Sequence, residues 1–257
     1  MSQPNTESTR LPTIAKTASW VTRRIHAALS ERRDIEAIER AKRVSLSQIG
    51  KCARAQWASL HGVPEENPPE GRILVLFDLG SAVEDHIVKL LWQAGFELSS
   101  IDDETGKQYE VSGFGGKVLG HLDGLIRFKK SQGEADWALL EIKSANAKKY
   151  AELELAGSYA QWNPVYGDQV QVYMGAKDLQ QALVIVENKD TSDLYVEVID
   201  FDQTRFTELW HKAADIASST KILDRPAEAK SQYCGYCKWC GVNKWCWGAT
   251  AGVTFDD

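Results

Sequence analysis

Acidic residues interrupt two apolar stretches in the middle of the sequence. Asp123 lies inside VLGHLDGLIRF, and Glu141 and Lys143 are two residues apart in WALLEIKS. Along a strand, residues i and i+2 face the same side, so Glu141 and Lys143 project together while Ile142 turns towards the core. A carboxylate that is buried without a partner is costly. The two acids therefore need a cation, and its identity decides what chemistry the site can do.

Two cations satisfy this need, and the residue pattern leaves both open. In the simpler case, Lys143 forms a plain ion pair with the acids. In the other, Asp123 and Glu141 hold a divalent ion such as Mg²⁺, which takes carboxylate, water and phosphate oxygens and can activate a bound water. Lys143 would then position or deprotonate the attacking water, or stabilise the leaving oxyanion.

Two further residue pairs lie at helical spacing on either side of this region. Glu84 follows Gly80 by four residues, and Tyr173 follows Gln169 by four residues. Each pair therefore lies on a single face of a predicted helix. His86, two residues after Glu84, would point to another helix face, so we do not expect it to take part.

Together these motifs resemble the PD-(D/E)XK nucleases. The series consists of Gly80-x-x-x-Glu84, Gly120-His121-Leu122-Asp123-Gly124, Glu141-Ile142-Lys143 and Gln169-x-x-x-Tyr173. It is most similar to the RecB-like exonuclease branch, which includes CRISPR-associated exonucleases and phage-encoded relatives. The resemblance implies a restriction-endonuclease-like α/β (α+β) fold, with a mixed central sheet flanked by helices. It also implies a Mg²⁺- or Mn²⁺-dependent deoxyribonuclease that hydrolyses single-stranded DNA or duplex ends.

The resemblance gives each motif residue an expected role. The three carboxylates would ligate Mg²⁺ or Mn²⁺, with the one on the first helix acting directly or through water. The lysine would be the catalytic base or an electrostatic stabiliser, and the glutamine and tyrosine would orient the substrate and the active-site groups. The residues expected to act in catalysis are Glu84, Asp123, Glu141, Lys143, Gln169 and Tyr173.

Four of the five cysteines lie close together near the end of the sequence. YCGYCKWCGVNKWCWG contains Cys234, Cys237, Cys240 and Cys246, whereas Cys52 lies far upstream. In a reducing cytoplasm, closely spaced thiols favour metal ligation over disulfides. Zn²⁺ and an iron–sulfur cluster both accept four thiolates, so the residues alone leave both open. A local site made by the four clustered thiols, with Cys52 idle, is a further alternative.

The family resemblance favours a 4Fe-4S cluster. Several of these nucleases bind one through a cysteine ahead of the core and three behind it, the latter spaced C-x2-C-x5-C. Cys52, Cys237, Cys240 and Cys246 match these positions, which leaves Cys234 as an alternative ligand and Zn²⁺ as the alternative metal. Ligands from both sides of the core would clamp the two ends of the domain together, and metal-binding free energy would then become folding free energy.

Length and composition limit the class of protein. The 257 residues carry a net charge of −6, with 43% hydrophobic and 26% charged residues, which is ordinary for a globular protein. This charge argues against a protein that coats DNA non-specifically, but it permits a nuclease whose basic groups line one groove. The apolar runs are too short to span a bilayer, and the N-terminus has no secretory signal pattern. We therefore expect the cytoplasm, and the family resemblance implies that of a bacterial or phage-infected cell.

The sequence predicts a helical start, a mixed α/β centre and a metal-bound end. Helices are expected over residues 18–43, about 76–95, 166–177 and about 204–223, and SLSQ at 45–48 is expected to be a capping box that opens a helix running to 61. Strands are expected over 107–128 and 137–144, with a hairpin of 182–188 and 194–201 further on. We divide the chain into a flexible segment 1–16, a helical region 17–70, a nuclease core 71–225 and a Cys-rich segment 226–257.

The leading hypothesis is a metal-dependent DNA exonuclease, with DNA and a recombination or single-strand-annealing protein as partners. Two hypotheses from other classes stay open. One is a DNA-binding accessory of recombination or CRISPR adaptation whose core serves as a scaffold. Loss of an acid or of the lysine would favour it, and all of them are present. The other is a zinc-ribbon interaction module on an inactive core, which would be colourless where an iron–sulfur protein is brown.

Overall fold

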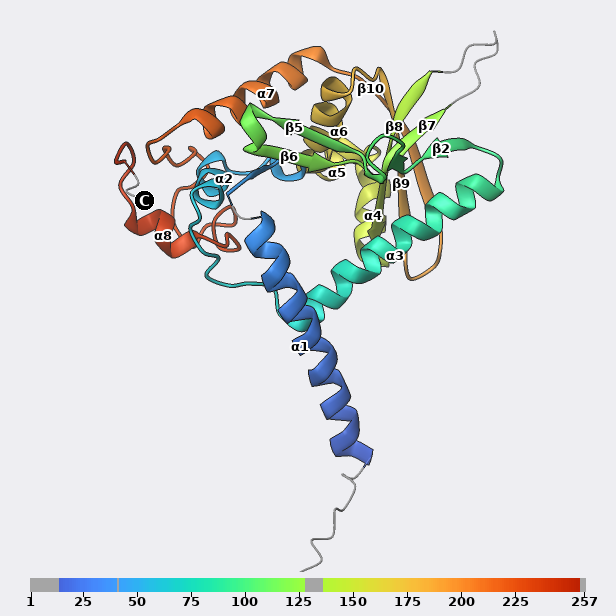
Figure 1. The fold of residues 1–257 in the computed structure, drawn as a ribbon, viewed down its shortest axis with the longest axis horizontal. Coiled ribbons are helices and arrows are strands. Elements are labelled where there is room, and N and C mark those ends of the chain that lie inside the picture. The colour runs from blue at the N-terminus through green and yellow to red at the C-terminus, as the bar shows by residue number, and fades with distance from the viewer. Residues whose placement is uncertain (1–13, 41, 128–135, 255–257) are drawn as a thin grey trace, which may run out of the picture. The chain divides into compact units, whose positions relative to one another are not determined.

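The computed structural model describes residues 14–40, 42–127 and 136–254, in which runs of helices and runs of strands follow one another along the chain (Figure 1). The helices are α1 (Ile14–Arg40), α2 (Ala53–Leu60), α3 (Gly71–Gln93), α4 (Ala147–Ala156), α5 (Tyr159–Trp162), α6 (Pro164–Ala176), α7 (Gln203–Ser218) and α8 (Asn243–Gly248). The strands are β1 (Val44–Ser45), β2 (Glu97–Ser99), β3 (Ile101–Asp102), β4 (Lys107–Gln108), β5 (Glu110–Gly113), β6 (Val118–His121), β7 (Gly124–Arg127), β8 (Trp137–Ala145), β9 (Gln181–Asn188) and β10 (Leu194–Asp200). Most of the predicted flexible segment, up to residue 13, lies outside the described residues. Within the described ranges, no helix combines the length and apolar character that crossing a bilayer requires.

The described residues form two compact units. One comprises residues 14–39 and 69–78, and the other comprises residues 40–68 and 79–254. In the first unit, an exposed ion pair joins Arg32 to Asp78 at 2.6 Å. All residues predicted to act in catalysis or to bind metal belong to the second unit. The division of the chain at residues 16, 70 and 225 stays a prediction.

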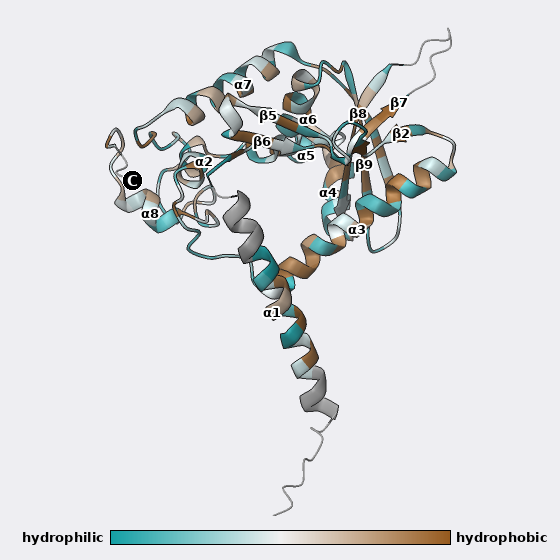
Figure 2. Cartoon of the chain, viewed as in Figure 1, coloured by the Kyte–Doolittle hydropathy of each residue, from teal (hydrophilic) through white to brown (hydrophobic). Residues whose placement is uncertain are grey.

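The second unit is built on a mixed five-stranded sheet in the order β10-β9-β8-β7-β2. β7 and β8 are antiparallel, as are β9 and β10, whereas β8 and β9 are parallel. A parallel pair needs a crossover, which α4, α5 and α6 supply. β7, β8 and β9 carry the hydrophobic colour of Figure 2, because strands covered on both faces are apolar along most of their length. The predicted mixed sheet flanked by helices is confirmed, as is the hairpin of β9 and β10.

Two hydrophobic clusters hold β8 from opposite sides. Leu140 and Ile142 pack with Ile87 of α3 in one cluster, and Leu139 and Ala145 belong to the other, together with residues of α4, α6 and α7. The alternation of side chains along a strand places these two sets on opposite faces of β8. Burying each large aliphatic side chain contributes about 1.5–3 kcal/mol. The position of β8 is therefore fixed from both sides.

The predicted capping box at residues 45–48 is wrong. Ser45 ends β1, and its hydroxyl lies 2.9 Å from that of Ser47 without capping a helix. Residues Leu46–Gln48 form a short 3-10 turn, and α2 begins only at Ala53, directly after Cys52. The local signal fails because β1 pairs in parallel with β6, which draws this segment into a three-stranded sheet of β1, β6 and β5.

The predicted strand over 107–128 is broken into β4, β5, β6 and β7. A short 3-10 turn at Phe114–Gly116 separates β5 from β6, and all three of its residues have positive φ. β5 and β6 pair with each other, whereas β7 joins the central sheet. The pattern of the sequence indicates extended structure here but not this change of partner.

Two arginines hold the C-terminal segment onto the second unit. Arg54, which is fully buried, donates to the carbonyl oxygens of Leu223, of Cys246 at 3.0 Å and of Ala249 at 2.8 Å. Arg225 donates to Cys246 at 2.7 Å and to Ala249 at 3.3 Å. Carbonyl groups at the end of a helix have no partner within the helix and attract cations. The two guanidinium groups therefore fix α8 and the chain that follows it.

We expect Arg54→Met to lower the free energy of unfolding by about 3 kcal/mol or more, because several buried carbonyl groups lose a charged donor. Urea unfolding followed by circular dichroism measures this change. Arg127→Met is the control: it removes an arginine whose ion pair with Glu97 is well exposed, and it should cost less than about 1 kcal/mol. Equal losses in the two variants would contradict this role for Arg54.

Candidate active site and cysteine cavity

Glu141 and Lys143 project from the same face of β8. Glu141 has no exposed surface, and Oε1 of its carboxylate lies 2.6 Å from Nζ of Lys143. The lysine side chain keeps 22% of its surface exposed. The pair thus links a carboxylate inside the protein to a lysine side chain that is partly exposed.

Asp123 reaches this pair from the turn between β6 and β7. Gly124 stands opposite Leu140 in the antiparallel register of β7 and β8, which brings the turn beside the ion pair. Oδ2 of Asp123 accepts a hydrogen bond from the backbone N–H of Ile142 at 2.8 Å and lies 3.8 Å from Nζ of Lys143. A carboxylate from this turn and one from β8 therefore lie beside one ammonium group.

α6 covers the buried acid with Gln169 and Tyr173. Nε2 of Gln169 donates to the two carboxylate oxygens of Glu141 at 2.9 and 3.1 Å. One turn further, Tyr173 packs against Gly120, where a Cβ atom would lie only 2.5 Å from the tyrosine Cε1. A glycine at this position lets the ring lie against β6. Burial raises the pKa of Tyr173 well above its usual range, so the phenol is neutral.

Glu84 lies on α3 and is half-buried. Burial, and secondly the nearby Asp123 carboxylate, raise its pKa to about 7, against the opposing effect of Lys143. Asp123 and Lys143 are therefore close enough to Glu84 for their charges to act on it. His86, two residues further, is exposed. The structure thus brings together the six residues that the motifs predict; their roles stay predictions.

Sequence reasoning missed Tyr159, which is fully buried beside the site. Its hydroxyl oxygen lies 3.5 Å from Oε1 of Glu141. A signal was present in SYAQWNPVY, where Tyr159, Trp162 and Tyr166 are spaced three and four residues apart, as on one face of a helix. Aromatic rings at this spacing usually indicate core packing, so the pattern alone does not reveal a place in the site.

The charges of the site are strongly coupled. Burial raises the pKa of Glu141 to about 7, and the nearby Asp123 and Glu84 add to this rise, while Lys143 opposes it. Burial would lower the pKa of Lys143, but Glu141 and Asp123 beside it raise the net value well above the usual range. The lysine is therefore protonated, and the three acids still hold more negative charge than one ammonium balances.

The donor set fits a hard divalent cation in its chemistry. All three acids offer oxygen ligands, and a second cation would offset both the burial and the like charges that raise the pKa of Glu84 and Glu141. In the described part of the chain, no three His, Cys, Asp or Glu side chains form a ready-made cage for a metal ion. Mg²⁺ does not need one, since it commonly binds one or two carboxylates and completes its shell with water and phosphate oxygens.

Four cysteines from both ends of the second unit line one cavity of about 480 Å³: Cys52, Cys237, Cys240 and Cys246. Burial raises the pKa of Cys237 to about 11 and also raises that of Cys240, so thiolates at these positions need a positive partner. Arg225 lines the same cavity, and its buried Nε has no acceptor within hydrogen-bond distance among the described residues. A buried donor beside four thiols fits a sulfur-rich, negatively charged group.

Cys234 is not part of this lining. Its Sγ lies 3.7 Å from the carbonyl oxygen of Glu228, on the side of the turn that leads into the cysteine segment. The four thiols that face the cavity are those in the predicted one-plus-three arrangement. Cys234 therefore lies near the cavity but does not line it.

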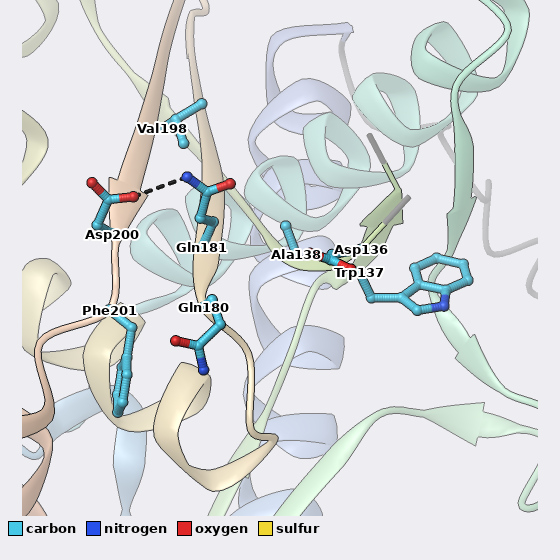
Figure 3. Close-up of a pocket in the computed structure, with 8 residues that line it drawn as sticks. All are labelled: Asp136, Trp137, Ala138, Gln180, Gln181, Val198, Asp200 and Phe201. Carbon is cyan, nitrogen blue, oxygen red and sulfur yellow. Dashed lines mark hydrogen bonds between the residues drawn. The ribbon is translucent and has the colours of Figure 1, made fainter. Parts of the chain in front are cut away.

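Another cavity of the second unit, of about 650 Å³, lies elsewhere. Asp136, Trp137 and Ala138 line it together with residues at the ends of β9 and β10 (Figure 3). Gln181 donates to Asp200 at 2.9 Å across it. None of the predicted site residues contributes to this lining, so its size gives no reason to assign it a function.

No family model and no curated protein sequence matches the chain. Solved structures that are similar to it include LHK-Exo in complex with dAMP, with 17% identity, 69% of this chain and 87% of that chain covered, and a TM-score of 0.49. Another is the alkaline exonuclease LHK-Exo from Laribacter hongkongensis, with 18% identity, 70% and 88% coverage and a TM-score of 0.47. A third is SSO0001, with 17% identity, 83% and 88% coverage and a TM-score of 0.42. At these values the likeness concerns the path of the chain, and assignment of function rests on the site.

Proposed function

We propose that this protein is a metal-dependent deoxyribonuclease of the RecB-like PD-(D/E)XK type, acting as an exonuclease on single-stranded DNA or duplex ends. The observation that carries the proposal is the meeting of Asp123, Glu141 and Lys143 at a partly exposed point of the sheet, where Lys143 lies 3.8 and 2.6 Å from the two carboxylates. A purely structural ion pair would not require a second carboxylate from the neighbouring turn between β6 and β7. An excess of negative charge beside an ammonium group suits a metal ion and a phosphate.

Mg²⁺ or Mn²⁺ would be held by Asp123 and Glu141, with Glu84 as a further ligand directly or through water. When bound, such an ion activates water and offsets the negative charge of the phosphodiester during hydrolysis. Lys143 is protonated beside the acids, so it suits an electrostatic role towards the phosphate better than that of a base. Gln169 keeps the Glu141 carboxylate in one orientation through two hydrogen bonds.

The cysteine cavity would hold a 4Fe-4S cluster, with Zn²⁺ as the alternative. Four thiolates suit either group, and the resemblance to nucleases with one cysteine ahead of the core and three behind it favours the cluster. Cys52, Cys237, Cys240 and Cys246 are the proposed ligands. When bound, the group would supply a cross-link between the two ends of the unit.

DNA is the proposed partner, and recombination, repair or CRISPR adaptation in the cytoplasm of a bacterial or phage-infected cell is the proposed setting. A recombination or single-strand-annealing protein would act on the product strands. A chain that binds DNA ends with Mn²⁺ but leaves them intact would instead be a DNA-binding accessory, with the same fold used as a scaffold.

Lys143→Met should lower the rate of DNA degradation about 100-fold or more, because the site loses its preorganised positive charge. End-labelled single-stranded and duplex DNA incubated with Mn²⁺ measures the rate and the preferred strand. Lys107→Met, at an exposed position on β4, is the control and should degrade DNA at the original rate. Unchanged activity in the Lys143 variant would contradict the proposal.

The metal-free protein should lose stability as the pH rises from about 4.5 to about 7. In this range the folded protein holds protons on Glu84 and Glu141 that the unfolded chain has released, so the free energy of unfolding falls with rising pH. For Glu141 the slope is at most about 1.4 kcal/mol per pH unit, and for the less buried Glu84 it is smaller. Urea unfolding with a chelator present measures this slope.

Glu141→Gln should remove most of this pH dependence, whereas Glu110→Gln, at an exposed position on β5, should leave it unchanged. Affinity for Mn²⁺ should change in the opposite sense and rise with pH through about 7, because the ligands must lose their protons. A slope that is unaffected by Glu141→Gln would mean that the buried acids do not titrate as their surroundings indicate.

Cys52→Ser should abolish the metal centre, and Cys234→Ser should preserve it, because Cys52 lines the cavity and Cys234 does not. Anaerobic purification, visible absorbance and analysis for iron, sulfide and zinc on the same sample measure the outcome. Retention of the centre in Cys52→Ser together with its loss in Cys234→Ser would indicate a local site formed by the four clustered thiols.

A further inference from the structure

Three aromatic rings form a cluster at the corner between α5 and α6. The ring centroids of Tyr159, Trp162 and Tyr166 lie 5.7 to 6.0 Å from one another. The corner is made by Asn163, whose side chain accepts a hydrogen bond from the first turn of α6, and by Pro164 as the first residue of that helix. Proline is favoured at this position because its missing N–H is not needed there. The sequence therefore fixes the three rings in one place.

Burial within the cluster is graded. Tyr159 has no exposed surface, whereas Trp162 and Tyr166 are only partly buried. The buried ring forms the floor of the cluster, and the other two rings keep surface that a ligand can reach. A cluster that served packing alone would gain from covering all three.

The cluster adjoins the candidate active site through Tyr159 and Tyr166. Nζ of Lys143 lies 5.9 Å from the ring centroid of Tyr166, and the Tyr159 hydroxyl lies 3.5 Å from Glu141. Lys143 and Asp123 keep 22% and 11% of their side-chain surfaces exposed. A positively charged group and reachable aromatic rings therefore lie side by side.

This pairing matches the two parts of a nucleotide. The phosphate is an anion that suits the ammonium group, and the base is a flat ring that stacks on aromatic side chains. We propose that Trp162 and Tyr166 form a stacking subsite for the base of the terminal nucleotide, while its phosphodiester lies at Lys143. The inference rests on the proposed function and adds a substrate contact to it. Because every base has a π face, the subsite would position a strand end without selecting its sequence.

The test compares the affinity of the full-length protein for three short single-stranded oligonucleotides: one intact, one with an abasic residue at the 5′ terminus and one with an abasic residue at the 3′ terminus. Binding is measured by fluorescence anisotropy with Ca²⁺ in place of the catalytic ion, and gels establish that the strands stay intact. Loss of the terminal base should weaken binding by the original protein about ten-fold at one of the two ends.

Trp162→Leu should bind the intact and abasic strands equally, and Trp162→Phe, which retains a ring, should restore most of the difference. Trp137→Leu is the matched control. Trp137 is another partly exposed tryptophan, but it starts β8, about 20 Å along the strand from Lys143, and its loss should leave the ten-fold difference intact. The ratio is taken within each variant, so a lower folded fraction does not alter it.

Equal binding of intact and abasic strands by the original protein would overturn the subsite, as would an undiminished difference in Trp162→Leu. These outcomes are separate from failure of the proposed function. Degradation of DNA without any preference for a terminal base would contradict the stacking subsite and leave the proposed nuclease function standing. A preference that depends on Trp162 in a protein without nuclease activity would support the subsite and contradict the nuclease.

Discussion

The carboxylate of Glu141 has no contact with solvent. Side chains from three elements of the second unit replace its hydration. Lys143 comes from the same strand, Gln169 from α6 and Tyr159 from α5. An isolated charge in this position would cost several kcal/mol, so β8, α5 and α6 must all be in place before the carboxylate is tolerated. Apolar residues of similar size commonly give equal or greater stability than a buried ion pair. The presence of the pair is therefore better explained by chemistry than by folding.

α6 connects the candidate active site with the cysteine cavity. Val165 lines the cavity at the start of the helix, and Gln169 binds Glu141 one turn later. Between them, Asp168 forms a bidentate ion pair with Arg205 at 2.7 and 2.8 Å. The chain just before Cys52 packs so closely on this helix that a Cβ atom at Gly50 would lie 2.6 Å from the Asp168 carboxylate. A group bound by the thiols would thus restrain the helix that orients the buried acid.

Regular patterns in the sequence predicted the helix and strand that carry the site. Strand pairing between distant segments determined the position of Asp123 and the structure of the segment before Cys52. The alternation in WALLEIKS gave β8 and the shared face of Glu141 and Lys143, and helical spacing gave α6. The approach of Asp123 to that pair depends on the register between β7 and β8, which no local pattern contains. The serine-rich signal before Cys52 failed for the same reason, because strand pairing outweighed helix capping. Tyr159 was missed because its spacing equally suits an ordinary core.

Contacts within the protein join the two ends of the second unit without any metal. These contacts bring the thiols of both ends to one cavity. Arg54, two residues after Cys52, already ties the N-terminal part to the carbonyl groups around Cys246. Protein contacts therefore preorganise the cavity, so a bound group would complete an arrangement that already exists. Closing a loop that contains most of the chain removes much freedom from the unfolded state. Such a cross-link would offset the free energy that the buried charges at Glu141 cost, and a site with excess negative charge could then persist in a stable fold.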